Sequence, residues 1–326
     1  MMKTNYHTHH YLCGHAEGNI EDYVLEAINN DFVEIGISDH GPINAEAFHR
    51  MTYEEFENIY LVEIEDAIKK YSGKIKILKG LEIEYVYGDD DYYSRLLNKI
   101  DYLILGPHYY IGEKVLVGHT TYQVDSKAKL ESYTKLIEDA LDSKLFKIIA
   151  HPDLFMHGYK EFDSFAEECA QRIVEAVIRN DALIEFNAGG IRTNRYFDEN
   201  GKPKYAVPND GFWKVVSRYN VKVILGSDCH KPKELNDDNF KYAKELANSY
   251  GLNIVNKIFE WSEFSGHFYF VKCIAYTHDG RSRCIEKRWN GQIFVSKPFI
   301  LSIKNHIYTK LHKTYSMGMF IAVFNV

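Results

Sequence analysis

The sequence has few of the features that mark extreme classes of protein. Its 326 residues include only 7 prolines and 21 glycines beside 45% hydrophobic residues, which excludes a collagen-like or wholly disordered chain. Its longest candidate apolar run, Met317–Val326, is far below the roughly 18 residues of a membrane-spanning helix. The sequence therefore predicts a globular protein of one large or two ordinary domains with no membrane partner.

A surplus of positive charge is also lacking. Lys and Arg number 39 against 46 Asp and Glu, a net charge of −7, so the chain has no overall basic field to attract nucleic acid. The five cysteines are an odd number scattered along the chain, which indicates reduced thiols. We therefore expect a cytoplasmic protein without a nucleic-acid partner, although a local basic patch is left open.

The charge is unevenly distributed along the chain. Ser262–Val326 has 9 Lys and Arg against 3 Asp and Glu, a charge of +6, which leaves −13 on Met1–Trp261. This shift predicts a domain over residues 1–261 and a basic, aromatic extension over 262–326. Segments such as Phe268–Ala275 and Gly291–Val295 could form added strands, an oligomer contact or a nucleic-acid patch, or belong to a poorly folded extension. The sequence leaves the role of the extension and the oligomeric state open.

Short apolar runs alternate with amphipathic segments over residues 1–261, which is typical of β-α units around a mostly parallel sheet. The seven expected strands are Lys3–His7, Val33–Ser38, Ile75–Ile83, Tyr102–Leu105, Lys147–Ala150, Ala182–Phe186 and Lys222–Leu225. The expected helices are Ile20–Asn29, Tyr53–Tyr71, Lys129–Ser143, Phe165–Arg179, Gly211–Tyr219 and Phe240–Tyr250. Asn19 and Asp22 predict a capping box at the start of the first helix.

Potential metal ligands follow six of the seven expected strands, and only Ala182–Phe186 lacks one. Because the carboxyl ends of parallel strands open onto one face, these side chains should converge there. His7 and His9 are two apart on extended backbone, as are Asp228 and His230, so the side chains of each pair should point the same way. Nine candidates exceed the roughly four ligands of one tetrahedral ion, so we expect two or three divalent ions, Zn, Mn or Fe. The candidates are His7, His9, His15, His40, Glu82, His108, His151, Asp228 and His230.

Other residues near these motifs are open to more than one interpretation. Glu84 shares a face with Glu82, so we expect one to be a ligand and the other to contact it. Cys13 could be a thiolate ligand, whereas Cys229 should face away from its neighbours and pack in the core. Some histidines fall at no strand end and are expected to be structural, namely His10, His49, His119 and those after Trp261.

Taken in order, these motifs resemble the polymerase-and-histidinol-phosphatase superfamily. The resemblance rests on His-Thr-His, Leu-Cys-Gly-His-Ala-Glu-Gly at Leu12–Gly18, Ser-Asp-His-Gly-Pro, Gly-Leu-Glu, the His-Pro at His151 and Gly-Ser-Asp-Cys-His. It runs from about Met1 to Phe259 and is strongest to the histidinol-phosphatases of histidine biosynthesis. It implies an α/β fold, a distorted seven-stranded (β/α)7 barrel with a trinuclear metal centre at the strand ends, followed by an extension of uncertain structure.

The resemblance also implies the ligands of each ion and the reaction. It assigns the first ion to His7, His9, Glu82 and Asp228, the second to Glu82, His108 and His151, and the third to His15, His40 and His230. It implies hydrolysis of L-histidinol phosphate, a small-molecule phosphomonoester, by a hydroxide that bridges two ions. The residues expected to act in catalysis are Glu82, Asp228 and His230.

Phosphate binding is expected from basic side chains. Arg192, in Asn-Ala-Gly-Gly-Ile-Arg, and Arg50 resemble arginine positions of the family. Relatives commonly have lysine or arginine shortly after the His-Pro histidine, where this chain has His157, which could bind phosphate when protonated. Pro107 replaces a small apolar residue, which should change the loop and leave the neighbouring histidine in place.

Two other functions are compatible with these motifs. A relative of the same superfamily could act on another phosphomonoester, such as a nucleotide or sugar phosphate, and a panel of phosphoesters would separate the two. A metal-sensing binding module is the alternative of a different class. Degenerate modules of that kind would have lost ligands, and no ligand of this sequence is replaced.

Overall fold

The computed structural model describes residues 3–43, 50–110, 119–193, 195–197, 199–201 and 203–259, together with three strands beyond residue 260. The chain divides into two units, Met1–Phe259 and Glu260–Val326, which are described separately. The division falls two residues before the shift in charge.

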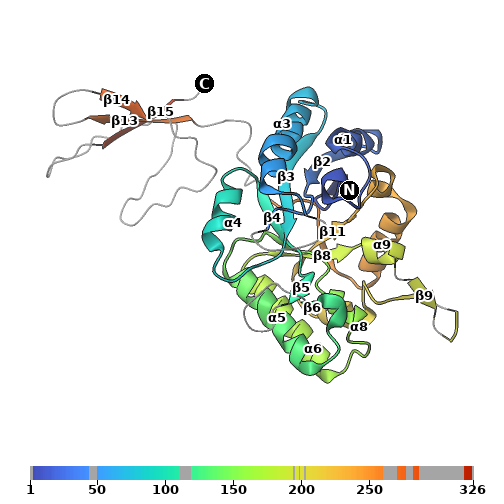
Figure 1. The fold of residues 1–326 in the computed structure, drawn as a ribbon. Helices are drawn as coiled ribbons and strands as arrows, with labels where there is room; N and C mark the ends of the chain where they lie inside the picture. The colour runs from blue at the N-terminus through green and yellow to red at the C-terminus, as the bar shows by residue number, and fades with distance from the viewer. Residues whose placement is uncertain are drawn as a thin grey trace. The chain divides into compact units, whose positions relative to one another are not determined.

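The first unit is built on a curved sheet whose eight described strands are all parallel (Figure 1). Seven of the strands coincide with the expected apolar runs. The eighth, at one edge, was missed because its three residues are too few to show a pattern. In spatial order the strands are β1 (Lys3–Asn5), β2 (Phe32–Ile37), β3 (Lys76–Ile83), β4 (Tyr102–Leu105), β7 (Ile148–Ile149), β8 (Leu183–Asn187), β11 (Lys222–Gly226) and β12 (Asn253–Val255).

The segments that follow β1 and β11 close the curve of the sheet. A parallel bridge joins Thr8 to Cys229, more than 200 positions apart in the sequence. Around it, the amide of His9 donates to the carbonyl of Cys229 at 2.9 Å, and the amide of Asp228 donates to the carbonyl of His7 at 3.0 Å. The expected distorted barrel is therefore confirmed, and its closure brings candidate ligands from both ends of the unit together.

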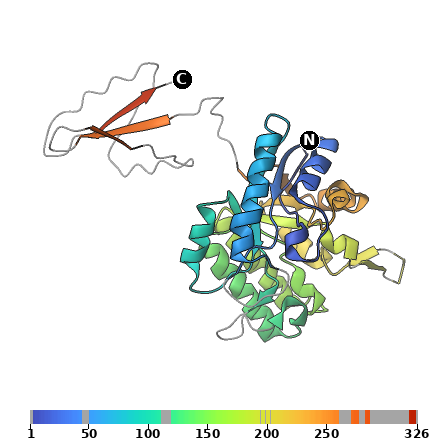
Figure 2. The same ribbon diagram turned by 45° about the horizontal axis from the view of Figure 1, so that its top comes forward.

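The helices lie on the outer face of the sheet in both views (Figures 1 and 2). Each expected helix is present, and the capping box is confirmed because Asn19 and Asp22 bond each other's backbone amides at 2.8 and 3.0 Å. The longer helices are α1 (Ile20–Asn29), α3 (Leu61–Lys70), α4 (Asp90–Leu97), α5 (Lys127–Asp142), α6 (Ser164–Arg179), α8 (Asp210–Val216) and α9 (Asp238–Ser249).

Two helical regions differ from the sequence prediction. The expected helix Tyr53–Tyr71 is divided into α2 (Tyr53–Glu55), the π-helical segment η2 (Phe56–Tyr60) and α3. The eight-residue helix α4 was not predicted. Its sequence, DDYYSRLL, is too short and too polar to give a clear apolar face.

The interior of the barrel is packed with aliphatic side chains and two tyrosines rather than open as a channel. Tyr102 is fully buried there, and its hydroxyl donates to the carbonyl of Tyr6 at 2.7 Å. A Cβ atom at Gly36 or Gly80 would lie only 2.0 or 2.3 Å from atoms of Tyr102, so the ring requires glycine at both positions.

The second unit contains an antiparallel sheet of three described strands in the order β14, β13, β15. They are β13 (Phe270–Tyr276), β14 (Ser282–Ile285) and β15 (Met319–Phe324). The expected strand Phe268–Ala275 largely coincides with β13, whereas Gly291–Val295 lies outside the described residues. Among the helices described in either unit, none has the length and apolar character needed to cross a membrane.

Tyr60 provides a test of how the helical layer is joined to the sheet. It is fully buried, and its hydroxyl contacts the carbonyl of Gly80 at 2.7 Å and that of Ile37 at 3.0 Å. Tyr60→Phe should lower the free energy of unfolding by about 1–2 kcal/mol in urea denaturation, because two buried carbonyls lose this donor. Tyr53→Phe, at a side chain that is 40% exposed, is the control and should change it by less than about 0.5 kcal/mol. Equal stability of the two variants would contradict the prediction.

Candidate metal centre

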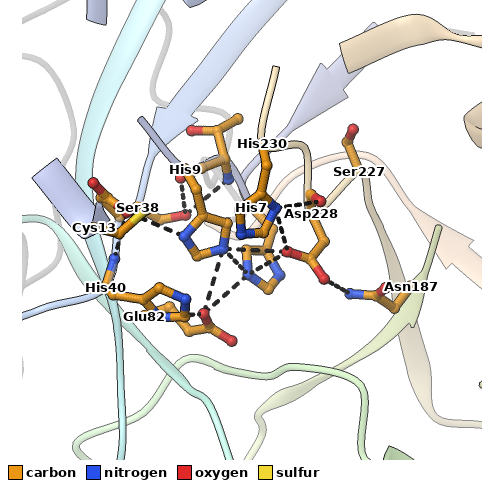
Figure 3. Close-up of polar contacts among 12 residues, drawn as sticks. His7, His9, Cys13, Ser38, His40, Glu82, Asn187, Ser227, Asp228 and His230 are labelled. Atoms are coloured by element: carbon orange, nitrogen blue, oxygen red, sulfur yellow. Dashed lines mark hydrogen bonds and ion pairs between the residues drawn. The ribbon is translucent and has the colours of Figure 1, made fainter. Parts of the chain in front are cut away.

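Glu82, near the end of β3, lies at the centre of the nine candidate ligands. Its side chain is completely buried. Its Oε2 atom is 3.4 Å from Nε2 of His7 and 3.4 Å from Nε2 of His9, which extend from the end of β1 (Figure 3). The same oxygen is 3.0 Å from Nδ1 of His40, which follows β2. One carboxylate oxygen therefore faces imidazoles from two neighbouring strands.

The other oxygen of Glu82 faces the opposite side of the cluster. Its Oε1 atom is 3.0 Å from Nε2 of His151 and 3.4 Å from Nε2 of His108. These histidines follow β7 and β4, and Pro107 leaves His108 at the cluster as expected. Glu82 is therefore placed to bridge two groups of ligands.

Asp228 and His230 complete the cluster from the end of β11. Oδ1 of Asp228 is 3.2 Å from Nε2 of His9 and 3.6 Å from Nε2 of His7. Nε2 of His230 is 3.0 Å from Nε2 of His15, whose ring centroid is 5.4 Å from that of His40. Because His15 is exposed and the His230 side chain is 29% exposed, the cluster opens to solvent on this side.

Ligand atoms of three residues approach within 4.8 Å of one another in several overlapping groups. They combine side chains from strand ends that are far apart in the sequence. The groups are His7, His9 and Glu82; His40, Glu82 and His108; His7, His151 and Asp228; His9, His40 and His230; and His9, Cys13 and Asp39.

The backbone is strained at two of these residues. His151 has φ of +28° and Asp228 has φ of +47°, in a region that residues other than glycine rarely adopt. Nearby glycines leave room for the carboxylates. A Cβ atom at Gly189 would lie 2.5 Å from Oδ2 of Asp228, and one at Gly106 would lie 2.8 Å from Oε1 of Glu82.

The charged surroundings shift the pKa values of the clustered carboxylates and imidazoles in different directions. Although burial opposes it, nearby imidazoles hold the pKa of Glu82 and that of Asp228 well below the usual carboxyl range. Burial, together with neighbouring positive charge, lowers the pKa of His40 and lowers that of His230 to about 4. Although burial opposes it, neighbouring carboxylates raise the pKa of His7 and of His151 and raise that of His9 to about 9, so a metal ion would have to displace protons from these three imidazoles.

The donor set fits divalent metal ions. Oε2 of Glu82 and Nδ1 of His40 lie 3.0 Å apart but are not aligned for a hydrogen bond, and no described residue supplies either buried atom with one. Imidazole nitrogens and carboxylate oxygens together suit zinc, manganese or iron. The number and identity of the ions are taken up below as part of a proposal.

Carboxylates also contact the second nitrogen of three imidazoles. Glu84 Oε1 is 2.9 Å from Nδ1 of His108, Asp39 Oδ1 is 3.2 Å from Nδ1 of His9, and Glu185 Oε1 is 2.7 Å from Nδ1 of His7. Such contacts orient metal-binding histidines and fix the tautomer. Glu82 therefore faces five imidazoles, whereas Glu84 contacts the outer nitrogen of one of them.

Asp39 and Glu185 were missed by the sequence analysis. Asp39 lies inside the Ser-Asp-His motif, where attention to the partners of metal-bound histidines could have identified it. Glu185 lies on β8, the strand without a ligand, and its sequence gives no comparable signal.

The cysteines and the remaining histidines lie largely as expected. Burial raises the pKa of the Cys13 thiol to about 12, which favours a thiol that donates to the carbonyl of His10 at 3.1 Å. Cys229 packs in the core, and His10 is buried against Tyr60. His49 and the tail histidines lie outside the described residues, as does the side chain of His119.

The residues expected to bind phosphate are engaged in other contacts. Arg192 forms an ion pair with Asp237 at 2.8 Å and donates to the carbonyl of Glu234 at 2.7 Å and to Ser227 Oγ at 3.3 Å. These contacts fix the loop that carries Asp228. They favour a structural role for Arg192, and its phosphate binding stays a prediction.

The contacts of Arg50 and the protonation state of His157 also disfavour phosphate binding by these side chains. The Arg50 side chain is buried and bonds both Glu84 and Nδ1 of His108, the latter at 3.3 Å. Burial and the neighbouring Lys160 lower the pKa of His157 to about 4, so its ring is neutral near pH 7. Binding of phosphate by a protonated His157 is therefore disfavoured at that pH.

Glu82 and Glu84 offer a matched pair for testing the ligand assignment. Glu82→Gln should remove bound metal, because a carboxamide is neutral and cannot bridge two ions with both of its terminal atoms. Glu84→Gln should retain the full metal content at saturating Zn²⁺, because Glu84 contacts Nδ1 of His108 rather than the centre of the cluster. Elemental analysis of both folded variants measures this. Equal metal content in the two variants would contradict the assignment.

Known proteins resemble this chain in sequence. The profile of the PHP domain matches residues 5–189. A probable histidinol-phosphatase from Deinococcus radiodurans is 26% identical over 238 residues, covering 70% of this chain and 86% of the relative. A probable phosphatase from Tolumonas auensis is 26% identical, covering 71% of this chain and 79% of the relative.

Two solved structures share the fold. A putative histidinol phosphatase from Listeria monocytogenes has a TM-score of 0.60 at 20% identity, covering 74% of this chain and 100% of that structure. A histidinol phosphate phosphatase from Lactococcus lactis, complexed with zinc, L-histidinol and phosphate, has a TM-score of 0.59 at 20% identity. The match covers 78% of this chain and 95% of that structure. Since the family profile spans more than half of the sequence, this chain belongs to the PHP domain family.

Proposed function

We propose that this protein is a metal-dependent phosphatase that hydrolyses L-histidinol phosphate to L-histidinol and phosphate. The observation that carries the proposal is the convergence of nine candidate imidazole and carboxylate ligands, Glu82 among them, at the ends of the strands. The names of the relatives support the reaction, and the Lactococcus lactis structure, with zinc, L-histidinol and phosphate, supports the choice of substrate.

The cluster has enough donors for two to three divalent ions, Zn, Mn or Fe. We infer that His7, His9, Glu82 and Asp228 hold one ion, that Glu82, His108 and His151 hold another, and that His15, His40 and His230 hold a third. When bound, such ions neutralise phosphate charge and lower the pKa of water, which supplies a nucleophile at neutral pH. Among these ligands, Glu82, Asp228 and His230 are the proposed catalytic residues, as the family resemblance implies.

The net charge of the domain makes binding of an anionic substrate depend on the metal ions. Residues 1–261 carry a net charge of −13, which repels a phosphate dianion. The carboxylates at the centre add to this repulsion, and Arg192 and Arg50 are already paired with carboxylates. Substrate affinity, as well as turnover, should therefore depend on the bound ions.

A phosphate-release assay with the purified protein tests the proposal. L-histidinol phosphate should be the best substrate in a panel that includes nucleotide and sugar phosphates. A chelator should abolish both turnover and binding of the substrate, and Zn²⁺ or Mn²⁺ should restore them. A metal-loaded protein that releases phosphate from none of the panel would overturn the proposal, and preference for another phosphomonoester would overturn only the substrate.

Arg192 allows the two possible roles of this side chain to be separated. Arg192→Lys should lower the melting temperature, because lysine cannot bond Asp237, Glu234 and Ser227 together as the guanidinium does. The KM of the remaining folded protein should change by less than about threefold, equivalent to roughly 0.7 kcal/mol. An increase of about tenfold or more in KM at unchanged stability would instead assign phosphate binding to Arg192.

A further inference from the structure

We propose that Glu185 and Asn187 are positioning residues that hold His7, His151 and Asp228 in place for the metal centre. Both lie on β8, which is the strand of the expected seven that supplies no ligand. They are two apart, so their side chains share a face of the sheet, and both are almost completely buried. The inference rests on the proposed metal centre and is independent of the substrate.

The Glu185 carboxylate accepts hydrogen bonds on both of its oxygens. Oε1 lies 2.7 Å from Nδ1 of His7. Oε2 accepts from the backbone amide of His151 at 3.1 Å and from the side-chain amide of Asn187 at 2.9 Å. Since a carboxylate only accepts, Nδ1 of His7 must carry a proton, and in the neutral ring that binds metal Nε2 is then the nitrogen that has the lone pair.

The same carboxylate holds a strained part of the backbone. His151 adopts φ of +28°, and its amide is fixed by Glu185 Oε2. This hydrogen bond helps to hold a conformation that the residue would rarely adopt otherwise. Glu185 therefore fixes a ring at one ligand and the backbone at another.

Asn187 extends the network to the third ligand. Its Nδ2 atom donates to Oδ2 of Asp228 at 3.1 Å (Figure 3). The same atom also donates to Glu185, and Oδ1 of Asn187 accepts from the amide of Gly190 at 3.2 Å. These contacts fix the orientation of the Asn187 amide. They also occupy Oδ2 of Asp228, which leaves Oδ1 facing His7 and His9.

The fold makes room for this network. Asn187 is paired with Gly226 on β11, and a Cβ atom at Gly226 would lie 1.6 Å from Oε1 of Glu185. The glycine is thus required by the buried carboxylate. The network links the three residues His7, His151 and Asp228, whose ligand atoms form one of the candidate metal groups.

Glu185→Gln is the principal test, because glutamine has nearly the same shape. If its amide group faces His7, Nδ1 must accept and the proton moves to Nε2, which blocks the metal. If the amide group faces the other way, it meets two N–H donors, from His151 and Asn187. Either arrangement should weaken Zn²⁺ binding to the full chain by about 10- to 100-fold, measured by competition with a chelating dye after removal of metal.

Glu34→Gln is the matched control. Glu34 is also buried, but it accepts from the Tyr6 hydroxyl at 2.8 Å and pairs with Lys76 at 3.1 Å rather than with a ligand. Both variants should lose stability, and only Glu185→Gln should lose affinity for Zn²⁺. This difference separates positioning of ligands from a general structural role.

Asn187→Ala keeps the proposal testable if Glu185→Gln does not fold. It removes the link to Asp228 and should weaken Zn²⁺ binding by about fivefold. Unchanged Zn²⁺ affinity in either folded variant, relative to Glu34→Gln, would overturn the proposal. Because Zn²⁺ binding is measured without substrate, failure to hydrolyse L-histidinol phosphate would overturn the proposed function and leave this result unaffected.

Discussion

The candidate site depends on the closure of the sheet between the segments that follow β1 and β11. The backbone hydrogen bonds at this closure involve the candidate ligands themselves, since the amide of Asp228 donates to the carbonyl of His7. Backbone pairing is directional and fixes relative position more tightly than side-chain packing does. Residues separated by more than 200 positions are thereby held in one cluster whose other members come from the strands between them.

Burial of so many ionisable groups requires that they compensate one another. Glu82 is fully buried, and the five imidazoles around it stabilise its charge. Glu84, Asp39 and Glu185 in turn contact the outer nitrogens of three of these imidazoles. An isolated buried charge would be very costly, so the cluster is stable only as a connected network.

The contacts of Arg192 argue against the expected binding of substrate phosphate by arginine side chains. Its resemblance to a phosphate-binding arginine concerns residue type and position, whereas in the structure its guanidinium supports the loop that carries Asp228. With Arg50 paired to Glu84, the described arginines nearest the cluster already have carboxylate partners. Recognition of an anionic substrate by a net-negative domain then rests mainly on the metal ions.

The sequence by itself determined the seven main strands along the chain and the candidate metal ligands at their ends. Both are local signals: apolar runs, and histidines or carboxylates directly after them. The helix α4 and the strand β12 were missed because they are too short and, in α4, too polar to show periodicity.

Only the tertiary structure decided which ligands face one another and what supports them. It separated Glu82 from Glu84 by their partners, and it placed Glu185 beside His7, 178 positions away. It also placed Glu185 against Gly226 on the neighbouring strand. Such contacts depend on register and on the curvature of the sheet, which involve residues far apart along the chain and leave no pattern within any one segment.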